Sequence, residues 1–188
     1  MDQRALVDRA REGDHDAFAE LVRASVVRLD GAARLILRDP DFARDAVQDA
    51  LFRAWRDLPR LRDPDRFDAW LHRLTVNACL DQVRRRRRRP TEVELDPIFA
   101  PAVPDGTGRI ADRDLVDGVL RRLDESGRAI VVLHYFLGMP LPEVAATLGI
   151  PTGTVKSRLH RALGDMRLAI ATDPITSGPT PVQEGQLA

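Results

Sequence analysis

The stretch PLPEVAATLGIPTGTVKSRLHRALGDMRLAI, Pro140–Ile170, decides the fold of the C-terminal part of the chain. Its first segment repeats apolar residues at helical spacing and ends at Gly149, which can take the left-handed conformation that closes a helix. Pro151 follows, and Thr152 or Thr154 can cap the next helix. That helix repeats its apolar residues at i, i+4, i+7, i+8 and i+11, namely Val155, Leu159, Ala162, Leu163 and Met166. The pattern predicts two short helices joined by a tight turn.

The polar face of the second predicted helix is cationic. It carries Lys156, Ser157, Arg158 and Arg161. A helix-turn-helix presents its second helix to the DNA major groove in this way, and arginine is well suited to reading guanine. Thr152 and Thr154 lie at the start of the helix, where hydroxyls and free amides suit a phosphate. The alternative is an ordinary helical hairpin with a solvated basic face, but the combination of features favours a DNA reader.

Composition limits the class of protein. The 188 residues carry no net charge, yet residues 1–90 and 113–172 are net basic while 91–112 are net acidic. Two basic blocks suit a polyanionic partner. No apolar run is long enough to span a membrane, and the charged N-terminus lacks a signal-peptide core, so we expect a cytoplasmic protein without membrane insertion. The single Cys79 lies in an apolar pattern and is expected to be buried, and the four histidines show no metal-ligand spacing. Neither a metal nor a cofactor is predicted.

The rest of the chain also has helical periodicity, and no stretch alternates at period two. Helices are expected at about 2–12, 16–37, 43–56, 67–87, 110–123 and 125–136, with Asp16 capping the second. The predicted fold class is therefore all-α, with two small helical domains at 1–89 and 112–172. An extended acidic, flexible linker at 90–111 joins them, and a Pro/Gly/Thr-rich tail at 173–188 is expected to be disordered.

Motifs in both halves resemble one family. GTVKSRLHRAL at Gly153–Leu163 and LPEVAATLGIP before it are similar to region 4 of the extracytoplasmic-function (ECF) group of sigma-70 factors. In the first half, DAVQDALFRAWRDL at Asp45–Leu58 and FDAWLHRLTVNACLDQVRRRRR at Phe67–Arg88 resemble region 2. The resemblance implies a dissociable sigma factor that binds bacterial core RNA polymerase and reads the minus-10 and minus-35 promoter elements. Such a factor has no catalytic activity of its own.

One polar strip is expected on the helix at 43–56. Spacing places Asp45, Gln48, Asp49 and Arg53 on one exposed face. The resemblance implies that this strip docks on the clamp helices of the largest polymerase subunit, with the polymerase flap region as a further contact. Spacing alone is equally compatible with solvated charges that support the helix weakly.

A second set of residues is expected to meet the minus-10 element. Helical spacing places Arg73, Asn77, Asp81 and Arg84 on one polar stripe, and Asn77 is the favoured base or backbone contact, although a buried amide is the alternative. Arg60, Arg62 and Arg66 in the preceding loop can hold phosphates. The run Arg84–Arg89, including Arg85 and Arg88, is expected to seat on the DNA backbone. Trp55 and Trp70 are expected to belong to the core.

Two further expectations concern partners and alternatives. The resemblance implies an anti-sigma factor, which in this family is often membrane-anchored, and a linker that enters the polymerase cleft; a plain spacer is the alternative for the linker. The competing function is a self-sufficient helix-turn-helix regulator whose N-terminal helices dimerise or sense a ligand. The region 2 motifs would be superfluous in such a sensor. An enzyme has little support, since no Gly-rich phosphate loop or nucleophile elbow is present.

Overall fold

The computed structural model describes residues 2–88 and 115–172 of the chain. These residues form helices and turns, and none of them lies in a strand. The predicted all-α class with two helical domains is confirmed. The expected linker at 90–111 and tail at 173–188 lie outside the described residues, as do the side chains of Arg87 and Arg88. No helix in the described part of the chain is long and apolar enough to cross a membrane.

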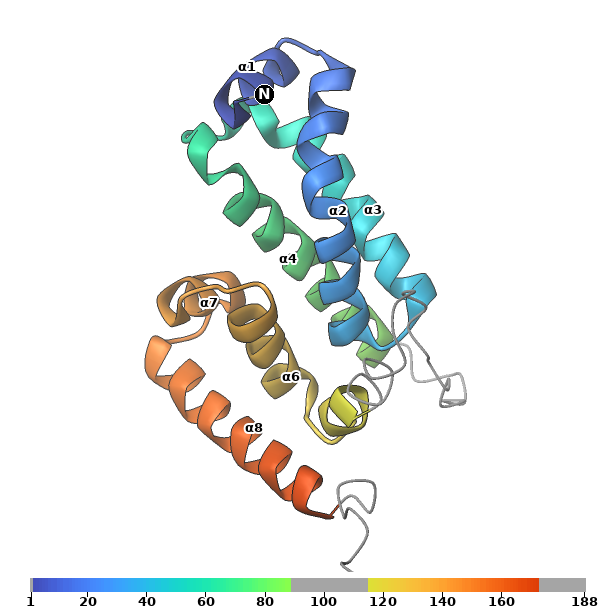
Figure 1. Cartoon of the computed structure of the whole chain (residues 1–188), viewed down its shortest axis with the longest axis vertical. Coiled ribbons are helices and arrows are strands. Elements are labelled where there is room, and N and C mark those ends of the chain that lie inside the picture. Colours follow the sequence, from blue (N-terminus) through green and yellow to red (C-terminus); the bar gives the residue numbers. More distant parts are fainter. Residues whose placement is uncertain (1, 89–114, 173–188) are drawn as a thin grey trace, which may run out of the picture.

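The N-terminal domain is a bundle of α1 (Gln3–Arg11), α2 (His15–Leu37), α3 (Pro40–Asp57) and α4 (Phe67–Arg88). In Figure 1, α2, α3 and α4 run alongside one another, and α1 lies across one end. Two short 3₁₀ turns, η1 (Leu58–Arg60) and η2 (Pro64–Arg66), connect α3 to α4 and pack against α1. The loop that carries the predicted phosphate-binding arginines is therefore held between three helices.

The starts of two helices differ from the sequence-based expectation. Asp14, and not Asp16, caps α2, because its carboxylate accepts the Ala17 N–H at 3.0 Å. The pKa of Asp14 is lowered mainly by the Ala17 N–H and also by the bond from Arg9. Helix α3 begins at Pro40 and not near residue 43 because Asp39 caps it and proline is well suited to a first helical position. The only break between α2 and α3 is a short turn with Arg38 at φ 57°.

The C-terminal domain begins with a helix at 115–121 and continues with α6 (Glu125–Val131), which passes into a π-helical turn, η3 (Val132–Phe136). The helix-turn-helix consists of α7 (Leu141–Leu148) and α8 (Thr152–Thr172). Gly149 has φ 66° and closes α7 in the left-handed conformation that its sequence position predicts. Val144, Val155 and Leu159 are buried, so the two helices share a core.

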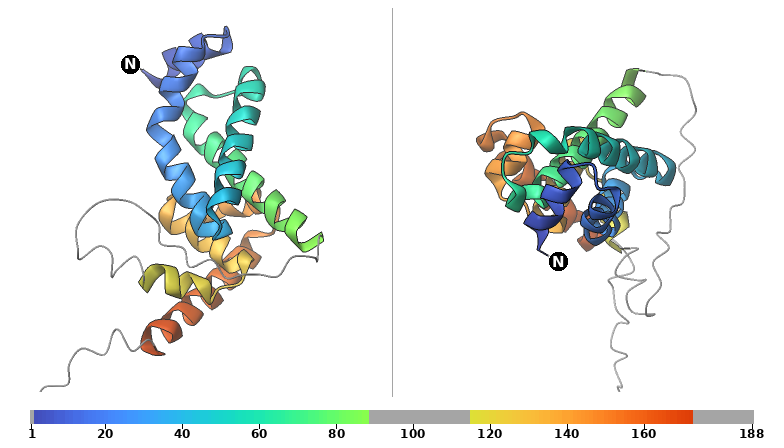
Figure 2. Two further views of the ribbon diagram at one scale, coloured as in Figure 1. Left: turned by 90° about the vertical axis from the view of Figure 1, so that its right-hand side faces the viewer. Right: turned by 90° about the horizontal axis from the view of Figure 1, so that it is seen from above.

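The two domains contact each other, which the sequence did not predict. Buried apolar side chains from both domains form one contiguous cluster. Figure 1 shows α6 and α7 between the N-terminal bundle and α8, and Figure 2 shows the same arrangement from two further directions. Arg128 of α6 is only 8% exposed and donates from Nε to the carbonyl of Ile36 in the last turn of α2 at 3.0 Å. A cation at the C-terminal end of a helix is favourably placed, because the free carbonyls there carry partial negative charge.

Candidate nucleic-acid interface

Helix α8 presents a polar face to solvent. Val155, Leu159 and Ala162 are buried against α6 and α7, whereas Lys156, Ser157 and Arg161 are exposed, as their positions in the sequence predict. His160 is exposed on the same helix. The outer face of α8 points away from the N-terminal bundle (Figure 1). This arrangement leaves a recognition helix accessible to duplex DNA.

The first turn of α8 differs in detail from the expectation. The helix begins at Thr152, so Thr154 lies inside the first turn and both threonines are half-buried. The Ser157 hydroxyl donates to the carbonyl of Thr154 at 3.0 Å. Its oxygen therefore remains an acceptor, and the two threonine hydroxyls stay close to the helix N-terminus, where a phosphate is favoured.

Arg158 is placed differently from Arg161. Its guanidinium turns back to α6, where Nη1 donates to the Ser126 hydroxyl at 2.6 Å, and the residue is half-buried. A cavity beside it is also lined by Arg122, Asp124, Arg161 and Asp165. Arg158 is thus tied to its own domain, whereas Arg161 is exposed to solvent.

The predicted minus-10 stripe on α4 contains an internal ion-pair network. Asp81 Oδ1 lies 2.9 Å from Nη1 of Arg84, and its Oδ2 lies 3.4 Å from Nη1 of Arg53 on α3. Arg53 also contacts Asp49 at 2.7 Å. Asp81 and Arg53 therefore bind each other. The carboxylate orients two arginines, and Arg53 connects the α3 strip to the α4 stripe. Arg73 is exposed and Asn77 is half-buried.

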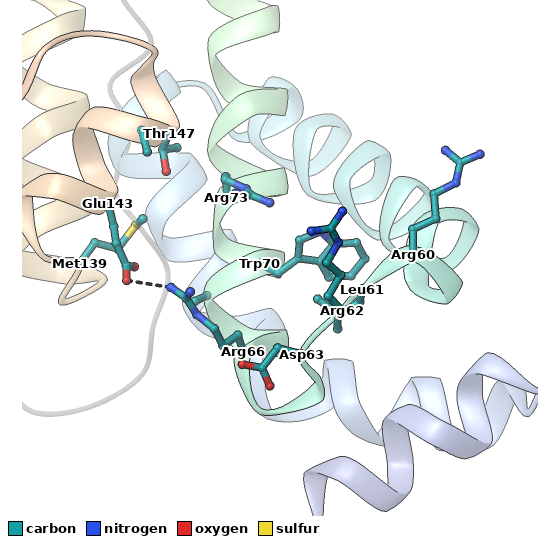
Figure 3. Close-up of a pocket in the computed structure, with 12 residues that line it drawn as sticks. Arg60, Leu61, Arg62, Asp63, Arg66, Trp70, Arg73, Met139, Glu143 and Thr147 are labelled. Atoms are coloured by element: carbon teal, nitrogen blue, oxygen red, sulfur yellow. Dashed lines mark hydrogen bonds and ion pairs between the residues drawn. The ribbon is translucent and has the colours of Figure 1, made fainter.

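The three predicted phosphate-binding arginines and one arginine of the predicted α4 stripe surround one cavity. Arg60, Arg62, Arg66 and Arg73 line it together with Trp70, and its volume is about 430 Å³. Figure 3 shows that the opposite wall comes from the C-terminal domain, and that the carboxylate of Glu143 on α7 points at Arg66. The distance from Arg66 Nη2 to Glu143 Oε1 is 3.0 Å. The amino-acid sequence gives no sign of Glu143 at this site, because the contact joins residues from separate domains.

The arginine run at the end of α4 is partly neutralised within the protein. The described side chains Arg84, Arg85 and Arg86 are exposed. Arg86 lies 3.5 Å from Asp39 and stacks over the Phe42 ring at 4.4 Å. Arg86 is therefore held against the bundle by these contacts, whereas Arg85 is exposed to solvent. The side chain of Arg88 lies outside the described residues.

The α3 strip has an apolar member that sequence analysis did not assign to it. Asp45 and Gln48 are exposed, and Asp49 is half-buried. Phe52 lies at i+7 from Asp45 and is 65% exposed, so the same face carries an aromatic ring. A rim of polar groups beside an exposed aromatic side chain is typical of a protein-binding surface. The i+7 spacing was the signal that could have identified Phe52.

The two tryptophans and the cysteine of the N-terminal domain contribute to its packing. Trp55 is half-buried and is not part of the core cluster that was expected to include it. It stacks on His15 at 4.4 Å between ring centroids and meets Phe18 edge-on. Trp70 packs against the core but also lines the cavity described above. Cys79 is fully buried, as expected, and burial raises the pKa of its thiol to about 12. The described residues hold no cluster of potential metal ligands.

Comparisons with known proteins agree with this arrangement. The model of sigma-70 region 2 matches residues 21–89, and the model of sigma-70 region 4 matches residues 113–166. The chain belongs to the sigma-70 family. The ECF RNA polymerase sigma factor SigM of Mycobacterium tuberculosis H37Rv is 39% identical to this sigma factor over 150 residues, which cover 80% of this chain and 75% of SigM. The RNA polymerase sigma-E factor of Streptomyces coelicolor is 37% identical, with 80% of this chain and 84% of that protein covered.

Solved structures place this sigma factor in the same fold. CnrH, solved in complex with the cytosolic domain of CnrY, matches 91% of this chain and 98% of its own with a TM-score of 0.65 at 30% identity. The sigma factor RpoE of Bartonella quintana, solved with the anti-sigma factor NepR, matches 82% of this chain and 98% of its own with a TM-score of 0.64 at 24% identity. Together with the ECF relatives, these matches identify a dissociable sigma factor that directs transcription initiation. Sigma factors of this family are transcription initiation factors and not enzymes.

Proposed function

We propose that this sigma factor binds core RNA polymerase through the exposed α3 face and reads promoter DNA with two separate surfaces. The domains involved are 1–89 and 112–172. The observation that carries the proposal is that one chain combines an exposed recognition helix with a second domain bearing both a cationic α4 and an aromatic-acidic strip. A self-sufficient regulator needs only the first of these.

The docking surface comprises Asp45, Gln48, Asp49 and Phe52. The carboxylates of Asp45 and Asp49 suit a basic helical partner, for which the clamp helices of the largest polymerase subunit are our candidate. Phe52 supplies the apolar anchor that a stable contact requires. Arg53 takes a supporting role, since its guanidinium is occupied by Asp49 and Asp81. The polymerase flap region is our candidate partner for the C-terminal domain.

The minus-10 surface is the arginine-lined cavity with its neighbouring α4 stripe. Opening a promoter requires a base to leave the stack, and an aromatic side chain beside cationic groups can receive a base and its phosphate. Trp70 and Asn77 are the candidates for base contacts, and Arg60, Arg62, Arg66 and Arg73 for phosphates. Asp81 holds Arg84 in position for the backbone.

The minus-35 surface is the outer face of α8. Arg161 is our candidate for base readout, together with Lys156 and Ser157, while Thr152 and Thr154 suit a phosphate at the helix start. Arg158 contributes by bracing α8 against α6. We further propose an anti-sigma factor as a regulatory partner, because the structural relatives CnrH and RpoE were solved with CnrY and NepR respectively. We place the protein in the cytoplasm, where its polymerase works, and assign it no catalytic activity.

The decisive experiment mixes the purified full chain with bacterial core polymerase. We expect co-elution in size-exclusion chromatography and transcripts with defined start sites on a genomic DNA library, whereas core polymerase alone gives none. Tight binding of the isolated protein to a palindromic duplex, without co-elution, would instead support the self-sufficient regulator.

A further inference from the structure

Helix α1 holds the loop that carries three of the candidate phosphate contacts. The Arg11 guanidinium donates from Nη2 to the carbonyl of Leu61, and the Gln3 amide donates from Nε2 to the carbonyl of Pro64 at 3.1 Å. Both acceptors belong to the backbone of the loop 58–66, which connects α3 to α4. The loop is therefore fastened at two points by side chains that lie 50 and 61 positions away in the sequence.

These two anchor points alternate with the arginines of the loop. Leu61 lies between Arg60 and Arg62, and Pro64 lies two residues before Arg66. A fixed carbonyl restricts the backbone on both sides of it, and so restricts where the neighbouring side chains can point. Hydrogen bonds from residues behind a binding site commonly hold its contact residues in this way.

The hydrogen bonds within the loop close single turns. The N–H of Leu61 donates to the carbonyl of Leu58 at 3.0 Å in η1, and the N–H of Arg66 donates to the carbonyl of Asp63 at 3.1 Å in η2. Neither of these bonds joins one turn to the other. The two donors of α1 contact both turns, so α1 fixes the position of η1 relative to η2.

Repulsion between like charges makes such anchors useful. Arg60, Arg62, Arg66 and Arg73 line one cavity, and neighbouring cations repel one another. The charge of Arg11 is balanced on its own helix, because its Nη1 lies 3.0 Å from Asp8. Bonds to backbone carbonyls therefore hold the loop in place until DNA phosphates supply the opposite charge.

Burial of Arg11 has a cost that points to a specific role. Leu6 and Val7 are buried and attach α1 to the bundle. Nε of Arg11 is buried as well, and it has no hydrogen-bond partner in the described part of the chain. A buried donor without a partner is unfavourable, and an apolar side chain would cover the loop without that cost. The guanidinium is explained by the Leu61 carbonyl that it holds.

We propose that α1 is a positioning element of the minus-10 site: Arg11 and Gln3 hold the loop 58–66 in the conformation in which its arginines receive single-stranded DNA. The match to sigma-70 region 2 begins at residue 21, so the family assignment gives α1 no role. The inference rests on the proposed function, since it takes this loop as part of the minus-10 surface. A loop that is ordered beforehand loses less conformational entropy on binding, and it binds more tightly and more selectively.

The test compares two substitutions in α1 with one control. Arg11→Met removes one donor to the loop and keeps a long side chain. Gln3→Met removes the other donor without a change of charge. Arg9→Met is the control for the lost charge, because Arg9 lies on the same helix and pairs with Asp14. The melting temperature of each variant is measured first.

Hydrogen exchange of the free full-length proteins measures the order of the loop. The amides of Leu61 and Arg66 are hydrogen-bonded within the loop and report on it. We expect the segment 58–66 to exchange about tenfold faster in Arg11→Met and several-fold faster in Gln3→Met, because local opening becomes easier. Arg9→Met should exchange at the wild-type rate. Equal exchange in all four proteins would overturn the positioning role.

The functional measurement uses holoenzyme assembled from core polymerase and each protein. Two fluorescent fork probes come from a promoter mapped with the wild-type protein: one carries the cognate single-stranded minus-10 bases, and the other has one of these bases changed. Loss of a charge alone weakens both forks equally and leaves the ratio of their affinities unchanged. We expect this ratio to fall about threefold or more in Arg11→Met and Gln3→Met, because the contact residues are displaced. It should stay at the wild-type value in Arg9→Met.

An unchanged ratio in both Arg11→Met and Gln3→Met, or an equal fall in Arg9→Met, would overturn the inference. If Arg11→Met does not fold, Gln3→Met alone decides. Arg62→Ala separates this failure from failure of the proposed function. Weak binding of the cognate fork by Arg62→Ala, beside wild-type behaviour of both α1 variants, would reject only the role of α1. Wild-type fork affinity in Arg62→Ala would reject the loop as a minus-10 contact, and the inference with it.

Discussion

The guanidinium of Arg53 on α3 contacts the carboxylate of Asp81 on α4, with 3.4 Å between Nη1 and Oδ2. The same carboxylate binds Arg84, and the same guanidinium binds Asp49. This relationship changes the role of two residues that helical spacing had placed on functional surfaces. Asp81 pairs with two arginines and does not itself favour DNA, and Arg53 links α3 to α4.

We expect Asp81 to make a modest contribution to the stability of the folded protein through this network. Asp81→Asn should lower the free energy of unfolding by about 0.5–1 kcal/mol, because partly exposed ion pairs contribute little individually. Chemical denaturation would measure the change. Asp41→Asn, which removes an 81% exposed partner of Arg44, serves as the control and should stay within ~0.5 kcal/mol of wild type. Equal stability losses in the two variants would contradict the bridging role.

Phe52 is expected to matter for polymerase binding and not for folding. Phe52→Ala should weaken affinity for core polymerase by about tenfold or more, since exposed aromatic anchors dominate many interfaces. The melting temperature should stay close to that of wild type because the ring is 65% exposed. Val27→Ala on α2, with 77% exposure, is a matched control. Surface plasmon resonance with immobilised core would separate them, and equal affinity of Phe52→Ala and wild type would remove Phe52 from the docking face.

The two arginines of α8 should respond differently to truncation. Arg161→Ala should lose ~1–3 kcal/mol of promoter discrimination with unchanged thermal stability, as expected for a lost base contact. Arg158→Ala should lower the melting temperature, because the substitution removes the hydrogen bond to Ser126. Differential scanning fluorimetry and in-vitro transcription on a mapped promoter together test this division. Ser126→Ala should reproduce part of the Arg158→Ala stability loss and leave transcription intact.

His72 should make the folded state sensitive to mild acid. Burial, and then the nearby Arg28, lower the pKa of His72 from its ordinary value of 6.5. The unfolded chain therefore binds a proton more readily than the folded protein, and stability is complete above about pH 6.5 and decreases as the pH falls below it. Urea denaturation at pH 7.5 and 5.5 should show the loss. His72→Gln should flatten this dependence, and a slope that persists in His72→Gln would assign it to another group.

Cys79 should resist thiol reagents while the protein is folded. With the pKa of the thiol near 12, almost no thiolate forms at pH 8, and the side chain is fully buried. Ellman's reagent should therefore react only after denaturation. Rapid reaction of the native protein would show that the α4 core opens readily.

The periodicity of apolar residues was sufficient to predict which face of a helix is buried. The spacing of Val155, Leu159 and Ala162 predicted the buried side of α8. The same spacing predicted that Lys156 and Arg161 are exposed, as they are in the structure. Helix starts were less certain. Asp14 and Asp16 are both acceptable caps, and only the hydrogen bond to Ala17 distinguishes them.

The amino-acid sequence alone was sufficient for the all-helical class, the helix-turn-helix and the separation of cationic from apolar faces, because these depend on spacing along one helix. The attachments of Arg158 to Ser126, Asp81 to Arg53 and Glu143 to Arg66 depend on where different helices meet. Spacing along a chain contains no information about the angle and distance between helices, and packing of the shared core sets both.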